Sequence, residues 1–298
     1  MKLSEAVRGV SGTLAADGEF SCIAFATEQE QSQFLTFLEK EKFLPALDNS
    51  KISCVLTTSA LAEKIPPHIK GVFLCDRPKA ALFEIHNRLA RHPDYVGASA
   101  ATVVGEGCSI SPLAAIDCEN VVIGDRVTIE PFVVIKGRVI IGNDVTIRSG
   151  AVIGCKGFSF SKDAQGQNVS VEDTARIIIE DHVEIFEQVA ISTGIFPWEE
   201  TRIGENTKVD AQCHIGHGAH IGRNCLLAEG SCGNSRVGDH VWVGVGAIVS
   251  NRVRVGDGAR VSLGSVVTKE VPAGQTVSGN FAIDHQKFLS NLKKSLEE

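Results

Sequence analysis

From residue 104 onward, an aliphatic residue recurs at every sixth position for long stretches of the chain. These positions form three series, which are Val104, Ile110, Ile116, Ile123, Ile129, Ile135, Ile141, Ile147 and Ile153, then Ile179, Ile185, Ile191, Ile203, Val209, Ile215, Ile221 and Leu227, then Val237, Val243, Val249, Val255, Val261 and Val267. Because six is an even number, a strand places them all on one face, whereas an α-helix scatters them around its axis. Gly, Asn and Asp often follow these residues and suit corners with positive φ. The pattern predicts a left-handed parallel β-helix of hexapeptide repeats over residues 98–283.

Two segments interrupt this period, residues 154–178 and residues 196–201. A loop that leaves a regular solenoid is either neutral decoration or part of a binding cleft. Loops on rigid scaffolds often carry function, so we favour the cleft.

The two ends of the chain lack the six-residue period. Residues 1–97 alternate helical segments, at 28–44 and 78–92, with the strand-like runs ISCVLTT and GVFLC, which predicts a small α/β domain. Residues 284–298 carry apolar residues at four-residue spacing, namely Phe288, Leu292 and Leu296. This spacing predicts a short amphipathic helix, which either caps the open end of the solenoid or contacts a partner; we favour the cap.

Composition and charge narrow the class of protein. A net charge of -7 argues against nucleic-acid binding, which relies on clustered Lys and Arg. No apolar run approaches the roughly 20 residues that span a bilayer, and the first ten residues lack the apolar stretch of a secretion signal. The nine cysteines are odd in number and contain no CxxC pair, so we expect reduced thiols in a cytoplasmic protein and no metal site.

Three histidines lie close together in the second series, at His214, His217 and His220. Imidazole is the natural general base near neutral pH. His214 and His220 occupy the same phase of consecutive hexads, so we expect them on different faces, where they cannot share a metal ion. His217 follows the inward Ile215 by two residues and is expected to point outward. An exposed histidine that is merely solvated remains an equal alternative for His214 and His220.

The segments SGAVIGCKGFSF, RIIIEDHVEI and KVDAQCHIGHGAHIGRN together resemble the N-acyltransferase family of lipid A synthesis, which acylates UDP-3-O-(3-hydroxyacyl)glucosamine. The resemblance implies that His217 is the general base and that the backbone N–H near Gly233, one coil above, stabilises the oxyanion. It further implies that the loop carrying Phe158 and Phe160 covers the acceptor and that Gln212 belongs to the substrate-binding residues. The active site would lie in a groove between the rods of a homotrimer.

The resemblance extends to the N-terminal domain, where FLEKEKFLPAL matches the uridine-binding segment of that family. It implies that Phe37 and Phe43 bracket the uracil, with Lys40 between them in place of the family's Asn. The alternative is that both aromatics are core residues of an amphipathic helix. No bound cofactor is expected; the thioester of acyl carrier protein or of coenzyme A is the co-substrate.

The chain departs from the family pattern near the expected site. Ser192-Thr193-Gly194 replaces an Asp-Arg-Gly sequence, and Arg252 stands where the family has a second His. Ile221 and Val237 are 16 residues apart where three hexads would span 18, which predicts a pinched coil. The segment VSGNFAIDHQKFL resembles the ending of CoA-using sugar acetyltransferases, and the tail KKSLEE is only weakly basic for a helix that docks acidic acyl carrier protein.

Three hypotheses follow. The first is an acyltransferase that moves an acyl group from a thioester carrier to the amine of a UDP-linked amino sugar. The second is a CoA-dependent acetyl or short-chain acyltransferase that acts on another nucleotide sugar. The third is a non-catalytic solenoid that serves as a scaffold.

Overall fold

The computed structural model describes residues 1–298 except 164, 234, 280–283 and 298. The chain forms two compact units. The first comprises residues 1–99, 157–175 and 194–199, and the second comprises residues 100–156, 176–193 and 200–298. The expected division near residue 97 therefore needs a correction, because most of each segment that interrupts the six-residue period folds with the N-terminal unit.

A five-stranded sheet forms the centre of the first unit. Its strand order is β1 (Thr13–Ala16), β5 (Gly71–Leu74), β4 (Ile52–Thr57), β3 (Phe34–Leu38) and β2 (Cys22–Ile23). Strand β1 is antiparallel to β5, and the other pairs are parallel. The helices are α1 (Leu3–Ala6), α2 (Pro78–Leu89) and α3 (Pro93–Val96), with 3-10 segments η1 (Glu41–Asp48) and η2 (Ser59–Lys64). The expected α/β character is confirmed.

The local predictions in this unit had mixed outcomes. The runs ISCVLTT and GVFLC form β4 and β5, and the helix predicted over 78–92 forms α2 from Pro78 to Leu89. The helix predicted over 28–44 is wrong, because Phe34–Leu38 forms strand β3 and the chain then enters η1. Four of the five β3 side chains are buried between parallel neighbours, so tertiary packing overrides the helical pattern.

The first interrupting segment forms an antiparallel hairpin, β15 (Phe160–Lys162) and β16 (Asn168–Ser170), which is bonded to α2. His86 Nε2 lies 2.8 Å from the Glu172 carbonyl oxygen, and Asn87 Nδ2 donates to the Ser170 carbonyl at 2.8 Å. The Glu172 N–H donates back to Asn87 Oδ1 at 2.9 Å. Two adjacent side chains of α2 thus hold the outgoing end of the hairpin.

The second interrupting segment contributes side chains to the core of the first unit. Phe196 is fully buried and stacks on Trp198 with ring centroids 5.9 Å apart. The indole N–H of Trp198 donates to the Ile23 carbonyl at 2.8 Å. The segment is therefore a structural part of the α/β unit.

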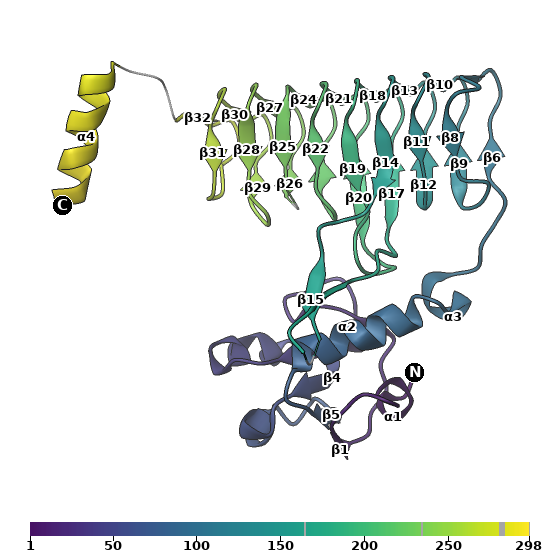
Figure 1. Cartoon of the computed structure of the whole chain (residues 1–298), viewed down its shortest axis with the longest axis vertical. Coiled ribbons are helices and arrows are strands. Elements are labelled where there is room, and N and C mark those ends of the chain that lie inside the picture. The colour runs from purple at the N-terminus through teal and green to yellow at the C-terminus, as the bar shows by residue number, and fades with distance from the viewer. Residues whose placement is uncertain (164, 234, 280–283, 298) are drawn as a thin grey trace. The chain divides into compact units, whose positions relative to one another are not determined.

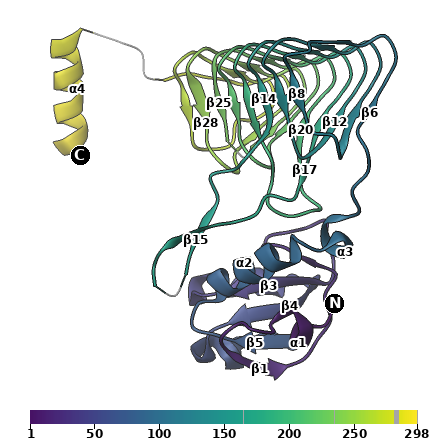
Figure 2. The same cartoon turned by 45° about the vertical axis from the view of Figure 1, so that its right-hand side comes forward.

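The second unit is a parallel β-helix of three sheets, and its coils stack one upon the next in Figures 1 and 2. The first sheet contains β7 (Ser109–Ile110), β10 (Thr128–Ile129), β13 (Thr146–Ile147), β18 (Glu184–Ile185), β21 (Lys208–Val209), β24 (Leu226–Leu227), β27 (Trp242–Val243), β30 (Arg260–Val261) and β32 (Thr276–Val277). The second contains β8 (Ala115–Ile116), β11 (Val134–Ile135), β14 (Val152–Cys155), β19 (Ala190–Ser192), β22 (His214–Ile215), β25 (Gly230–Cys232), β28 (Ala247–Val249) and β31 (Val266–Val267). The third contains β6 (Val103–Val104), β9 (Val121–Ile123), β12 (Arg138–Ile141), β17 (Arg176–Ile179), β20 (Glu200–Ile203), β23 (His220–Ile221), β26 (Arg236–Val237) and β29 (Arg254–Val255).

The residues of the six-residue period form the core of this solenoid. Ile129, Ile147 and Ile185 pair in register on successive coils, and each is essentially inaccessible to solvent. Neighbouring coils bury each other's apolar face, so one continuous core runs through the solenoid. The fold prediction is confirmed.

The predicted pinch is present. His220 pairs with Arg236 and Ile221 with Val237, so this coil closes with 16 residues instead of the 18 that separate Ile203 from Ile221. The strands keep their parallel pairing, and the shortening is taken up in the turns.

The tail forms helix α4 (His285–Glu297), which confirms the predicted helix. The side chains of Phe288 and Leu296 lie outside the described residues, and its capping role stays a prediction. Across the described ranges, every helix is too short or too polar to cross a lipid bilayer.

Candidate active site

His217 lies at the corner that follows strand β22, two residues after the inward Ile215. Burial of the ring lowers the pKa of His217 below its ordinary value, and repulsion by His214, whenever that ring is itself protonated, and by Arg252 lowers it further. Among the described residues, none forms a hydrogen bond with the His217 ring nitrogens. The imidazole is therefore neutral near pH 7 with a nitrogen available to accept a proton.

His214 precedes this corner on the outer face of the second sheet, where it pairs with Ala190 of β19. Its Nε2 lies 3.1 Å from the Ser192 hydroxyl. The same hydroxyl lies 3.3 Å from the Cys155 thiol, on the next strand of the sheet. Cys155, Ser192 and His214 thus form a hydrogen-bonded chain across three successive strands of one sheet.

The backbone at the His217 corner is held from two sides. The Gly218 N–H donates to Thr201 Oγ1 at 2.9 Å, and the Thr201 hydroxyl donates to the Ser192 carbonyl at 2.8 Å. Arg236 Nη1 donates to the Gly218 carbonyl at 2.8 Å. Gly218 has a φ of 69°, which suits glycine at this tight corner. These bonds fix the backbone beside His217.

His220 lies on the third sheet, in register with Arg202 and Arg236. Its Nε2 is 3.2 Å from the Glu200 carbonyl oxygen, and burial, followed by the charge of Arg236, lowers its pKa. The expectation that His214 and His220 occupy different faces is confirmed.

The N–H of Gly233 itself does not suit the predicted oxyanion donor, and a donor elsewhere near Gly233 stays a prediction. The Gly233 N–H donates to the Val249 carbonyl at 2.9 Å as part of the ladder between coils, so it is not available to an oxyanion. The shortened coil explains the error, because Ile215 pairs with Cys232, 17 residues away. Two positions past Cys232 is residue 234, which lies outside the described residues.

Gln212 lies at the opposite end of β22 from His217. It is an exposed corner residue with a φ of 58°, and its N–H donates to the Glu187 carbonyl at 3.0 Å. Its role in substrate binding stays a prediction.

The predicted uracil-binding residues lie in different environments of the first unit. Phe37, on β3, is partly buried and packs edge to face on Phe25 with ring centroids 6.5 Å apart. Phe43, on η1, is 55% exposed, and Lys40 is the exposed residue before η1. Phe43 thus offers a ring face to solvent, whereas part of the Phe37 ring is already covered.

The two aromatic residues of the first interrupting segment remain open to solvent. Phe158 is 94% exposed and Phe160 is 46% exposed, and their rings contact each other edge to face at 5.1 Å. They belong to the same compact unit as Phe43.

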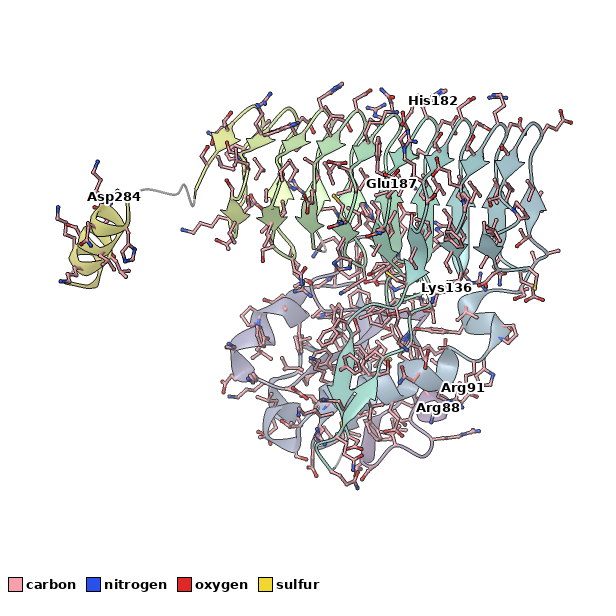
Figure 3. The ribbon with its side chains drawn as sticks, turned by 45° about the horizontal axis from the view of Figure 1, so that its top comes forward. Arg88, Arg91, Lys136, His182, Glu187 and Asp284 are labelled. Atoms are coloured by element: carbon pink, nitrogen blue, oxygen red, sulfur yellow. The ribbon has the colours of Figure 1, made fainter. Side chains whose placement is uncertain are left out.

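The first unit also contains a cavity of about 510 Å³ that the sequence did not predict. Its wall includes Asp76 and Arg77 after β5, Arg88 and Arg91 at the end of α2, and Lys162 of the hairpin. Figure 3 labels Arg88 and Arg91 at that end of the helix. Arg88 donates to the carbonyls of Arg8 and Ala6, so it holds α1 to α2. The cavity forms where the hairpin packs on α2. The interruption of the six-residue period by the hairpin was the only feature of the sequence that pointed to it.

The repeats define the class of the protein. The family model described as "Bacterial transferase hexapeptide (six repeats)" matches residues 120–155 and 200–232. The solved UDP-N-acetylglucosamine acyltransferase from Campylobacter jejuni is 23% identical, with a TM-score of 0.54 over 65% of this chain and 79% of that chain. The protein therefore has the fold and repeats of the hexapeptide transferases.

Two curated relatives specify the family. The UDP-3-O-acylglucosamine N-acyltransferase of Helicobacter hepaticus is 30% identical over 79% of this chain and 76% of the relative. The enzyme of the same name from Bradyrhizobium sp. is 30% identical over 68% of this chain, and the match spans 64% of that enzyme's length. The chain belongs to the UDP-3-O-acylglucosamine N-acyltransferase family, which is a family of acyltransferases, and the predicted resemblance is confirmed.

Proposed function

We propose that this protein transfers an acyl group from a thioester carrier to the amine of a UDP-linked amino sugar, in lipid A biosynthesis. The observation that supports the proposal most is the environment of the His217 imidazole, in a chain that belongs to this family. It has free ring nitrogens among the described residues, a lowered pKa and a tightly held corner.

In the proposed reaction, the sugar amine attacks the thioester carbon while His217 accepts the amine proton. The resulting tetrahedral intermediate carries an oxyanion. When it collapses, the C–S bond breaks, the new amide remains on the sugar, and the protonated His217 returns the proton to the leaving thiolate. Because Gly233 is engaged, we assign stabilisation of the oxyanion to the positive charge of Arg252, which is close enough to lower the pKa of His217.

The acceptor and donor assignments are further proposals. Phe43 is our first candidate for stacking on uracil because its ring is exposed, with Phe37 and Lys40 contributing nearby. Phe158 and Phe160 are proposed to cover the acceptor, and Gln212 to contact it. The donor is acyl carrier protein or coenzyme A. We propose that the protein is a homotrimer and that it is located in the cytoplasm. The eight cysteines that the structure describes are free thiols, which agrees with a reducing compartment.

The test replaces His217 by Asn and measures turnover of UDP-3-O-acylglucosamine with acyl carrier protein and with CoA donors. A fall of about 10²–10⁴-fold is expected for a lost general base. The matched control is His182→Asn at an outer corner of the same solenoid, labelled in Figure 3, where His182 is 54% exposed. We expect that variant to keep wild-type turnover.

Other outcomes point to the other hypotheses. Fast turnover with acetyl-CoA alone would indicate a short-chain acyltransferase for another nucleotide sugar. Wild-type protein without turnover on any donor would indicate a scaffold, and full activity of His217→Asn would remove His217 as the base.

A further inference from the structure

Ser192 is a buried polar residue, 3% exposed, at the end of strand β19. It stands where the family resemblance led us to expect an aspartate. Its hydroxyl lies within hydrogen-bonding distance of both the Cys155 thiol and His214 Nε2, and its carbonyl accepts from Thr201. Ser192 is therefore linked to residues on both sides of the proposed base, directly to His214 and through Thr201 to Gly218.

The side-chain arm of this network reaches His214, three residues before His217. A hydroxyl has one proton, so the chain runs in one direction at a time. If the Cys155 thiol donates to Ser192 and the Ser192 hydroxyl donates to His214 Nε2, the proton of a neutral His214 resides on Nδ1. The Nδ1 atom has no hydrogen-bond partner among the described residues, and His214 is exposed. In that direction, the hydrogen-bonded chain presents the His214 Nδ1–H as an oriented donor on the exposed face of the second sheet.

The backbone arm reaches Gly218, directly after His217. The Ser192 carbonyl accepts from Thr201, and Thr201 Oγ1 accepts the Gly218 N–H. Thr201 is fully buried, so the link is shielded from water. Ser192 is consequently hydrogen-bonded to His214, before His217 in the sequence, and is linked through Thr201 to Gly218, after it.

We propose that Ser192 is a positioning residue of the acyl-transfer site, which orients His214 so that its Nδ1–H donates a hydrogen bond to a hydroxyl or carbonyl oxygen of the acceptor sugar. The proposal rests on the proposed function for the identity of the acceptor. A sugar ring suits this donor because hydroxyl groups accept hydrogen bonds without bringing charge beside His217.

The first test needs no turnover. In ¹⁵N-labelled protein, long-range ¹⁵N–¹H spectra report the tautomer of each imidazole, and His214→Ala assigns the signal. We expect one Nδ1–H tautomer of His214 in wild type and a mixture in Ser192→Ala. Cys155→Ser should keep the single tautomer because a hydroxyl can replace the thiol as donor, whereas Cys155→Ala should loosen it. An unchanged His214 signal in Ser192→Ala, with circular dichroism confirming the fold, would overturn the proposal.

The second test measures binding of UDP-glucosamine by titration. Ser192→Ala and His214→Ala should each weaken Kd about tenfold, the effect of one oriented hydrogen bond. The double variant should be no weaker than His214→Ala, because Ser192 acts through His214. If the losses of binding affinity in the two single variants add up in the double variant, Ser192 does not act through His214. Where the acceptor can be turned over, the same variants should raise its KM and leave the donor KM unchanged.

The two proposals can fail separately. A mixture of His214 tautomers in wild type would refute the positioning role, even if His217→Asn still lowered turnover by about 10²–10⁴-fold. A single tautomer with UDP-glucosamine bound at His214, but no acyl transfer with any donor, would support the positioning role and refute the acyltransferase.

Discussion

At the scale of single residues, the proposed acyl transfer requires a neutral His217. Burial, repulsion by His214 whenever it is protonated, and the charge of Arg252 favour the neutral ring, so the His217 ring stays unprotonated to a lower pH than an ordinary histidine. By contrast, the solvated alternative that we considered for His214 and His220 is wrong for His220, whose ring is half-buried and bonded to the Glu200 carbonyl.

The pH dependence of turnover follows from this environment. In the proposed mechanism the neutral form of His217 is active, so kcat/KM should fall as the pH drops through the pKa of His217. This acid limb should lie below the ordinary histidine value of about 6.5. Arg252→Gln removes one charge that lowers the pKa, so the acid limb should move to higher pH. A pH–rate profile of both proteins measures the shift. An acid limb that stays in place in Arg252→Gln would contradict the role given to that charge.

The buried hydroxyl of Thr201 offers a second prediction at this scale. Thr201→Val leaves the Gly218 N–H and the Ser192 carbonyl without this partner, which should lower the free energy of unfolding by about 1–3 kcal/mol. Urea unfolding measures this cost. We also expect turnover to fall at least tenfold, because the corner beside His217 loosens.

Thr207 provides the control for that experiment, because it makes the same two bonds at another corner. Its hydroxyl donates to the Gly222 carbonyl at 2.7 Å and accepts the Cys225 N–H at 3.0 Å, and it is equally buried. Thr207→Val should cost similar stability and leave turnover intact below its melting temperature. Equal loss of turnover in both variants would show that stability alone matters.

At the scale of elements, the interrupting segments changed our interpretation most. We favoured a cleft for both, yet the second segment supplies core side chains to the α/β unit. Phe196 is fully buried there, so Phe196→Ala should lower the free energy of unfolding of that unit by about 3–5 kcal/mol. Phe158→Ala, at a 94% exposed side chain on the other segment, should leave stability unchanged. Chemical denaturation of the two variants makes the comparison, and equal midpoints would contradict the structural role.

The contrast between elements shows what a sequence can predict. The β-helix was predictable because its core repeats locally, with one inward residue in each six and corners that suit Gly and Asn. The helix expected over 28–44 failed because β3 is determined by its neighbours β2 and β4. The bond between Ser192 and His214 was not predictable, because it depends on strands paired across an excursion to another unit. His217 was proposed as the base from the resemblance and from its phase in the repeat, and this role stays a prediction.

At the scale of the whole molecule, the proposed trimer explains the exposed apolar side chains on the late coils of the solenoid. Ile248 and Val266 pair in register on the outer face of the second sheet and are 46% and 54% exposed. Val245 and Leu263, at the corners just before them, are 52% and 60% exposed. Apolar groups in such a row gain stability when a second copy covers them.

Light scattering should therefore give a particle of three times the 31.8 kDa chain mass.

Ile248→Asp places an unpaired charge in this row of apolar side chains and should shift the protein toward the monomer, because a buried, uncompensated carboxylate is costly. The active site is proposed to lie between rods, so acyl transfer should fall together with the trimer fraction as the protein is diluted. Ser250→Asp, one strand-face position away on the same coil, serves as the matched variant, since Ser250 is already polar. A fully active Ile248→Asp monomer would show that a single rod holds the complete site.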